Sequence, residues 1–185
     1  MSISACGLTP RLPAPVQYDL GAGGMPAAQA RSPLTVQVVS VTAPPWMDDT
    51  GIIYRFTFQN PYRRERYRDS RWVAAPAEMV RERIRERFAP PVGKASVGTA
   101  PAALLPLRVE LEEFEQEFTD ARHSHVVVRL RASLSGAAPG EAPREHRLEV
   151  DREAATPDAP GAVAAFSGAV DEAIDQLGGW AGAHP

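Results

Sequence analysis

The histidines are the residues whose spacing most directly suggests chemistry, because two of them lie only two positions apart. His123 and His125 stand beside an expected turn, where both imidazoles could face one metal ion. A zinc site needs further ligands at a recognisable spacing, and the other two histidines, His146 and His184, are isolated in the chain. The sequence therefore predicts solvated turn residues here and no metal site.

Acidic residues are dense between positions 110 and 120, where the chain carries six carboxylates. Acid–base catalysis by paired carboxylates requires two groups in different environments, so that one stays protonated while the other is ionised. The pattern shows no such asymmetry, since most of these side chains should lie on the wet side of a hairpin. We predict no catalytic pair among them.

Two further motifs resemble cofactor-binding or catalytic signatures but fail on spacing. Residues 21–24 (GAGG) follow a short apolar segment, as a dinucleotide-binding turn does, yet the third glycine position is Pro26 and no periodic helix follows. Ser167 lies in the sequence AFSG, without the glycine two positions earlier that a nucleophile elbow requires. The sequence predicts neither a cofactor nor an enzyme.

The strongest charge feature is the stretch 55–87, which holds ten arginines and five acidic residues. Arginines interleaved with Tyr62, Tyr67 and Trp72 are typical of a surface for nucleic acid or anionic lipid. However, glutamates recur every four residues among the later arginines, as in a solvated helix with ion pairs. The whole chain also has a net charge of −3, so we expect no nucleic-acid partner.

Cys6 is the only cysteine among 185 residues, so the chain cannot form an internal disulfide. A lone cysteine is often a buried neutral thiol, but Pro10, Pro13 and Pro15 follow this one near the chain end, where order is usually poor. Residues 1–15 are therefore predicted to be a tether, which from Cys6 onward would reach roughly 30 Å at about 3.1 Å per residue. Residues 16–185 then form one domain. No run of eighteen apolar residues predicts a membrane span.

The elements that must position these residues follow from the apolar periodicity. Strands are expected within residues 16–20, 34–41, 51–58, 66–72, 107–118, 126–134 and 146–150, with bulges between Val38 and Val39 and near residues 112–113. One helix should begin at Pro76 and end before Pro90, and a second should carry an apolar stripe from Val163 to Leu177 and end near residues 178–179. These elements predict an α+β fold, with a single mixed, mostly antiparallel sheet of about six strands and two helices on one face.

Several of these segments also resemble, in order, one protein family. The matching stretches are residues 18–21 (YDLG), 36–41 (VQVVSV) with 44–48 (PPWMD), 52–55 (IIYR), 71–76 (RWVAAP), 109–115 (VELEEFE) and 163–167 (VAAFS). Together they resemble the ABC-type transport auxiliary lipoproteins, the PqiC-like proteins that accompany MCE-type lipid transport systems of Gram-negative envelopes. The resemblance covers nearly all of residues 16–177.

The resemblance implies a protein anchored to the outer membrane and facing the periplasm, without catalytic activity. Residues 3–6 (ISAC) look like a bacterial lipobox, in which Cys6 is lipidated, and Gly7 fits sorting to the outer membrane. Several acyl chains hold a protein firmly where a single chain binds only marginally. A signal peptide would then be expected upstream of Ile3 in the native chain.

The implied partners are an MCE-domain protein and its transporter complex, with a phospholipid ligand and a homo-oligomer also open. The candidate docking surface is the arginine-rich segment or the exposed Trp46 loop, and the candidate residues are Trp46, Arg63, Arg64, Arg66 and Tyr67. Two other functions stay open: a periplasmic lipid-binding carrier, which would need an apolar cavity of several hundred Å³, and a regulatory lipoprotein of envelope assembly.

Overall fold

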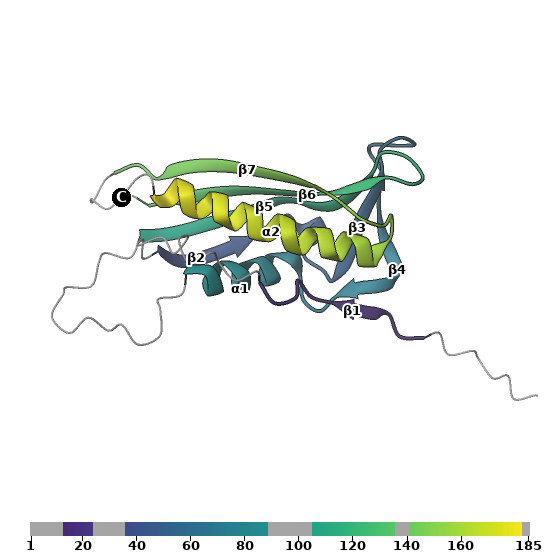
Figure 1. Ribbon diagram of the computed structural model, residues 1–185. Helices are drawn as coiled ribbons and strands as arrows, with labels where there is room; N and C mark the ends of the chain where they lie inside the picture. The colour runs from purple at the N-terminus through teal and green to yellow at the C-terminus, as the bar shows by residue number, and fades with distance from the viewer. Residues whose placement is uncertain (1–12, 24–35, 89–104, 136–140, 183–185) are drawn as a thin grey trace, which may run out of the picture.

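The computed structural model describes residues 13–23, 36–88, 105–135 and 141–182, which form one sheet of seven strands with two α-helices on one side of it (Figure 1). In chain order the elements are β1 (Val16–Tyr18), β2 (Val36–Thr42), the 3-10 helix η1 (Pro45–Met47), β3 (Gly51–Phe56), β4 (Arg64–Trp72), α1 (Pro76–Phe88), β5 (Leu105–Phe118), β6 (Ser124–Leu134), β7 (Arg144–Glu153) and α2 (Ala159–Gly182). The predicted α+β class, with a mixed sheet and two helices, is confirmed.

Strand β5 organises the sheet because its 14 residues pair with three other strands. β6 runs antiparallel along its whole length, while β2 and β3 both run parallel to it and share its other edge. β2 pairs with Leu105–Glu110, and β3 pairs with Gln116–Phe118. β4 then pairs with β3 and β7 with β6, both antiparallel, and β1 pairs with β4 in parallel.

Both predicted bulges are present. The register of β2 against β5 shifts between Val38 and Ser40, and the register of β5 against β6 shifts between Leu111 and Glu113. Because side chains alternate along a strand, the second bulge is what allows Leu111 and Phe114 to face the same core. Both side chains are at most 1% exposed.

Three turns lie together at one end of the sheet, which we name the hairpin end. Strands β3, β5 and β7 run in the same direction, so their C-terminal ends meet there. The turns are residues 57–63, 119–123 and 154–158, on the right in Figure 1. β1 runs parallel to β4 and pairs with Ser70–Trp72, so the chain approaches from the side of the hairpin end and joins the sheet beside the last residues of β4.

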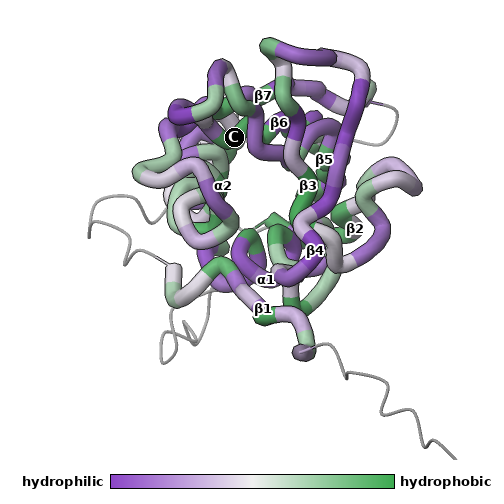
Figure 2. Tube along the Cα trace, turned by 90° about the vertical axis from the view of Figure 1, so that its right-hand side faces the viewer, coloured by the Kyte–Doolittle hydropathy of each residue, from purple (hydrophilic) through white to green (hydrophobic). Residues whose placement is uncertain are grey.

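The helices begin where the local sequence favours it. α1 starts at Pro76, as predicted, because the fixed φ of proline and its missing N–H suit the first helical turn. α2 starts after Asp158, whose Oδ1 accepts hydrogen bonds from the Thr156 hydroxyl (2.6 Å) and the Gly161 N–H (2.9 Å). These bonds lower the pKa of Asp158 and cap the helix. Figure 2, seen from the hairpin end, shows the strands curving around the two helices.

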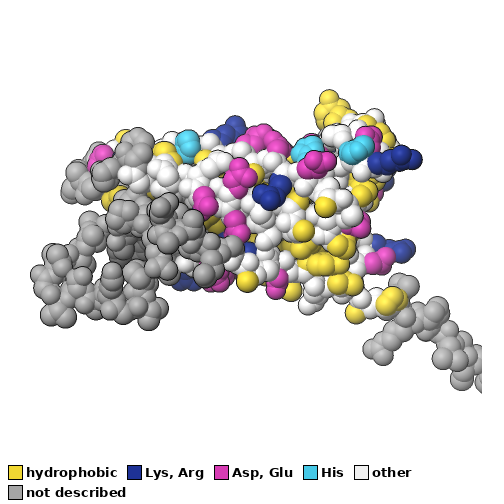
Figure 3. Space-filling model, in the orientation of Figure 1, with side chains coloured by type: hydrophobic (Ala, Val, Ile, Leu, Met, Phe, Trp, Pro, Cys, Tyr) yellow, Lys and Arg dark blue, Asp and Glu magenta, His cyan; other side chains and the backbone are white. Residues whose placement is uncertain are grey.

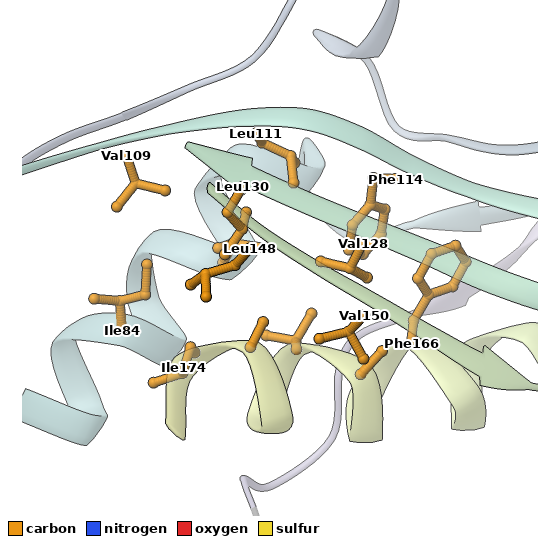
Figure 4. Packing of buried hydrophobic residues seen from close by; sticks show 14 of the residues in the cluster. Ile84, Val109, Leu111, Phe114, Val128, Leu130, Leu148, Val150, Phe166 and Ile174 are labelled. Atoms are coloured by element: carbon orange, nitrogen blue, oxygen red, sulfur yellow. The ribbon is translucent and has the colours of Figure 1, made fainter. Parts of the chain in front are cut away.

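The core fills the space between the helices and the sheet. Phe166, Val170, Ile174 and Leu177 form the buried stripe of α2, each at most 1% exposed. Phe166 stacks on Phe114 of β5 with 4.2 Å between ring centroids, and Trp72 meets both rings edge-on. Figure 4 shows Phe114 and Phe166 facing each other between the strands and α2. Stacked and edge-on pairs are the favoured aromatic geometries.

Several predicted boundaries differ from those in the structure, and the end of α2 differs most in its physical cause. α2 continues through Gly178 and Gly179 to Gly182, because Ala181 is buried and Trp180 stacks on His146 with 5.2 Å between ring centroids. This packing overrides the low helix propensity of the two glycines. β3 ends at Phe56, two residues before the predicted end.

Candidate docking surface

Trp46 is positioned by the short helix η1. Pro44 and Pro45 end β2, as predicted, and the Met47 N–H donates to the Pro44 carbonyl (2.9 Å). Met47 is buried in the core at 1% exposure, which fixes its neighbour Trp46 at the surface in a half-buried position. The indole therefore lies beside the adjacent strand β4.

Arg64 and Arg66 alternate along β4 and lie on the same face as Trp46. The guanidinium carbon of Arg64 is 4.2 Å from the centroid of the Trp46 ring, a cation–π contact. Arg66 Nη2 donates to the Trp46 carbonyl (2.8 Å) and is 3.0 Å from Asp49 Oδ2. The structure thus brings together three of the five predicted docking residues, and we name Trp46, Arg64 and Arg66 the Trp46 surface.

Glu115 is joined to the Trp46 surface by an ion pair with Arg64. It alternates with Phe114, which packs on α2, so it lies on the face of the sheet that the helices leave uncovered. Its side chain is 0% exposed, accepts a hydrogen bond from Arg64 Nε (2.8 Å) and pairs also with Arg55. Burial raises the pKa of Glu115, and the two arginines oppose this effect. Arg64 is therefore oriented before any partner arrives.

The same ion pairing continues across the uncovered face of β5, β6 and β7. Glu113 pairs with Arg129, and Arg129 Nε donates to Glu149 Oε2 (2.6 Å), which lowers the pKa of Glu149. Glu112 pairs with Arg131 (2.5 Å) and Arg147 (2.6 Å). Three of the six clustered carboxylates, Glu112, Glu113 and Glu115, therefore form cross-strand ion pairs with arginines.

The other two predicted docking residues lie elsewhere. Arg63 is in the turn 57–63, is 70% exposed and pairs with Glu65 (3.0 Å). Tyr67 faces away from the Trp46 surface, since its hydroxyl donates to Gln116 Oε1 (2.7 Å) and its ring lies 4.7 Å from Tyr54. Burial raises the pKa of Tyr67, and we place this residue in the packing of the sheet rather than on the docking surface.

The glycine-rich segment after β1 has a structural role that spacing alone did not predict. The carbonyls of Leu20 and Gly21 accept hydrogen bonds from Arg83 Nη2 (2.7 and 3.0 Å), and the Ser167 hydroxyl donates to the same Leu20 carbonyl (2.6 Å). Gly21 has φ +68°, and a Cβ at Gly23 would lie 2.2 Å from Arg83 Nη1. We name residues 16–21 the strap, which is held by both helices.

Arg83 itself could have been noticed in the sequence. It lies three residues after Val80 and one before Ile84, so it falls on the apolar stripe of α1 and not on the solvated face. Its side chain is 6% exposed, and its Nε is 3.4 Å from Asp171 Oδ1 on α2. An arginine at such a position needs buried acceptors, and the strap carbonyls supply them.

Two open grooves flank the strap. One, of about 370 Å³, lies between the strap and α1 and is lined by Val73, Met79 and Arg83 among others. The other, of about 420 Å³, lies between the strap and α2, beside Val163 and Ser167. Both are surface depressions that the strap separates.

Among the described residues, no group of three or more His, Cys, Asp or Glu side chains could hold a metal ion. His123 Nδ1 lies 2.8 Å from Asp120 Oδ2, and this bond raises the pKa of His123. Within the same residues, neither helix combines the length and hydropathy needed to cross a bilayer.

Comparison with known families gives a direct match. The family model described as the ABC-type transport auxiliary lipoprotein component matches residues 18–178. The chain belongs to this family. No enzymatic activity is known for the auxiliary lipoprotein family. Because its members are lipoproteins, the family indicates a membrane-anchored protein of the cell envelope. No curated protein matches the chain significantly.

Solved structures share the fold of this auxiliary lipoprotein. A crystal structure of a DUF330-family protein from Xanthomonas campestris has a TM-score of 0.72 and 18% identity, and the match covers 90% of this chain and 94% of that one. A crystal structure of an uncharacterized protein has a TM-score of 0.64 and 11% identity, over 91% and 99% of the two chains. At these identities the likeness concerns the fold.

The lipidation of Cys6 in this auxiliary lipoprotein stays a prediction, because Cys6 lies outside the described residues. The described chain begins at Pro13, three residues before β1 enters the sheet. A lipid on Cys6 would therefore be joined, through the intervening residues, to the strap and its contacts with α1 and α2.

Proposed function

We propose that this protein is an outer-membrane-anchored periplasmic subunit of an MCE-type lipid transport system, and that it acts by contact and not by catalysis. The observation that carries the proposal is the family match over residues 18–178. Two features support it: a proline-rich N-terminal sequence with a lipobox-like start, and a preformed surface of the kind that binds proteins.

The anchor would act through Cys6. Once lipidated, this residue would connect the domain to the outer membrane, and Gly7 after it favours that membrane. The strap gives such an anchor a firm attachment, because β1 pairs with β4 and the Leu20 carbonyl accepts hydrogen bonds from both helices. A pull on the tether would therefore be carried by the folded body.

The Trp46 surface is suited to docking because it combines tryptophan and arginine, the residue types enriched among binding hot spots. Glu115 already orients Arg64, and the Trp46 carbonyl orients Arg66, so little side-chain entropy remains to be lost when a partner binds. The expected occupant is a complementary surface of the MCE protein.

Association of the purified MCE protein with the full chain tests this proposal. Arg66→Glu is expected to raise the Kd by at least about tenfold, in the range of a hot-spot residue. Arg68→Glu is the matched control, because Arg68 lies on the same strand and is 88% exposed, with Asp69 as its ion-pair partner (3.0 Å). If the two folded proteins do not associate at all, the proposal fails.

A lipid carrier would instead need an enclosed apolar cavity. The space between α2 and the sheet is filled by the core around Phe114 and Phe166 (Figure 4), and the two grooves beside the strap are open to solvent. We therefore favour docking. Native mass spectrometry that finds a copurified lipid would favour the carrier.

A further inference from the structure

We propose that the hairpin end is a second membrane contact, in which Phe58 and Tyr62 enter the headgroup region of the bilayer. This inference rests on the proposed anchoring through Cys6. It assigns an orientation to the anchored domain, with the hairpin end toward the lipid and the opposite end toward the periplasm.

The two aromatic side chains are exposed on an ordered turn. Tyr62 is 92% exposed and Phe58 is 46% exposed. The turn is closed by hydrogen bonds from the Gln59 and Asn60 N–H groups to the Phe56 carbonyl (3.0 and 2.9 Å), and the Tyr62 N–H donates to Asn60 Oδ1 (3.0 Å). The backbone therefore fixes the outward position of these rings. Figure 3 shows hydrophobic side chains at the upper right of the molecule, over this hairpin.

Aromatic packing supports the turn from below. Phe58 meets Phe56 edge-on with 5.8 Å between centroids, and Phe56 lies 4.8 Å from Phe118 of β5. Tyr54 also contacts Phe56, at 5.3 Å. Phe58 is thus the outermost ring of a column that reaches back into the sheet, which resists displacement of the tip.

The length of the tether restricts which end can reach the membrane. From Cys6 to Pro13 the chain can span at most about 25 Å, at up to 3.6 Å per residue. β5, with its 14 residues, is about 46 Å long at about 3.3 Å per residue. Since the chain approaches β1 from the side of the hairpin end, a lipidated Cys6 can bring this end to the bilayer surface but cannot bring the opposite tip there head-on.

The chemistry of the tip fits a lipid surface. Residues 57–63 contain no carboxylate, and their single charge is that of Arg63, which is 70% exposed. In the neighbouring turn, the negative charge of Asp120 is offset by the positive charge of Arg122. Tyrosine is enriched at membrane interfaces, where its apolar ring and polar hydroxyl are both satisfied, and arginine can extend to the phosphates. The expected occupant is therefore a phospholipid bilayer.

The lone cysteine allows a direct test with the full chain. Cys6 is coupled to a maleimide phospholipid in phosphatidylcholine vesicles that contain brominated acyl chains, which quench nearby tryptophans. We expect Tyr62→Trp to add a fluorescence signal that the brominated lipid quenches by at least about half relative to unbrominated vesicles. Val39→Trp is the matched control, because Val39 is 49% exposed and lies on β2, toward the opposite end, and its added signal should not change.

A second variant measures the energetic contribution of the tip. Without coupling, the bound fraction of Phe58→Ser/Tyr62→Ser on the same vesicles should fall by about tenfold or more, since burying one large aromatic side chain alone has this effect. Equal quenching at positions 62 and 39, or unchanged binding of the double variant, would overturn the inference. The inference would also be overturned if the double variant no longer bound the MCE protein while the tryptophan at position 62 was not quenched by brominated lipid. The turn would then contact a protein and not a membrane. The attachment of Cys6 to the maleimide lipid does not require the MCE protein. Failure of this chain to bind the MCE protein would therefore contradict only the proposed function.

Discussion

The substitution Arg83→Met tests whether the strap is held as the structure indicates. It removes the hydrogen bonds of the guanidinium to the Leu20 and Gly21 carbonyls and its contact with Asp171 (3.4 Å), while it preserves most of the apolar stem. Hydrogen bonds to a charged group contribute about 1.5–3 kcal/mol each. Because Leu20 keeps its bond from Ser167, and Gly21 is partly exposed, we expect a total loss of about 2–3 kcal/mol.

Urea unfolding followed by circular dichroism measures this loss. For a chain of this size, it corresponds to a decrease in Tm of about 4–12 °C. Hydrogen exchange adds a local measure: the Val73 N–H donates to the Tyr18 carbonyl of β1 (2.8 Å) and should lose protection when the strap loosens. The matched control is Arg85→Met on the same helix, whose side chain is 60% exposed and which should change stability by less than about 0.5 kcal/mol.

The reasoning would be refuted if Arg83→Met cost no more than Arg85→Met and left the exchange of Val73 unchanged. A double-mutant cycle with Ser167→Ala sharpens the test, because Arg83 and Ser167 donate to the same carbonyl. Loss of the second donor leaves a buried acceptor unsatisfied, so we expect a coupling energy of about 1 kcal/mol or more. Simple additivity would indicate that the Leu20 carbonyl reaches water when either donor is lost.

Three further outcomes are expected. Phe166→Ala should lower the free energy of unfolding in urea by about 3–5 kcal/mol, because it removes one ring of the aromatic stack between α2 and the sheet. Phe58→Ala should lower it by less than about 1 kcal/mol, because Phe58 is 46% exposed. Equal losses would contradict the assigned core. Asp158→Ala should lower the free energy of unfolding by about 1 kcal/mol at neutral pH because it removes the cap of α2. Since the folded-state pKa of Asp158 is lowered, this difference from the parent protein should shrink as the pH falls through that pKa. A difference that does not depend on pH in unfolding titrations would argue against the cap. Glu115→Gln should cost about 1.5–3 kcal/mol because it removes the nearer anion of Arg55 and Arg64, which keep Glu113 at 3.8 and 3.4 Å. A stability equal to that of the parent protein would show that solvent already screens these ion pairs.

Much of the fold could be predicted because the relevant signals are local. The start of α1 depends on Pro76 and the stripe of Val80 and Ile84, and the bulge in β5 follows from the change of parity before Phe114. Periodicity also gave the β5–β6 hairpin, whose strands are close in the sequence. The end of α2 was wrong because Trp180 packs on His146, a contact that helix propensity does not contain.

The candidate site was predicted only in part. Residue types indicated Trp46, the arginines of β4 and Tyr67 as candidates, but only strand alternation in the folded sheet shows that Tyr67 turns toward Gln116. The pairing of Arg55 with Glu115 spans 60 residues and could not be read from spacing.

By itself, the sequence determined the type and approximate limits of most elements, the family, and the presence of one cysteine on a proline-rich segment. Only the tertiary structure decided that β2 and β3 share one edge of β5, that Trp46 meets Arg64, and that Leu20 is held by Ser167 from 147 positions away. The physical reason is that periodicity and capping act within a few residues, whereas these contacts form only when burial of the whole core brings distant segments together.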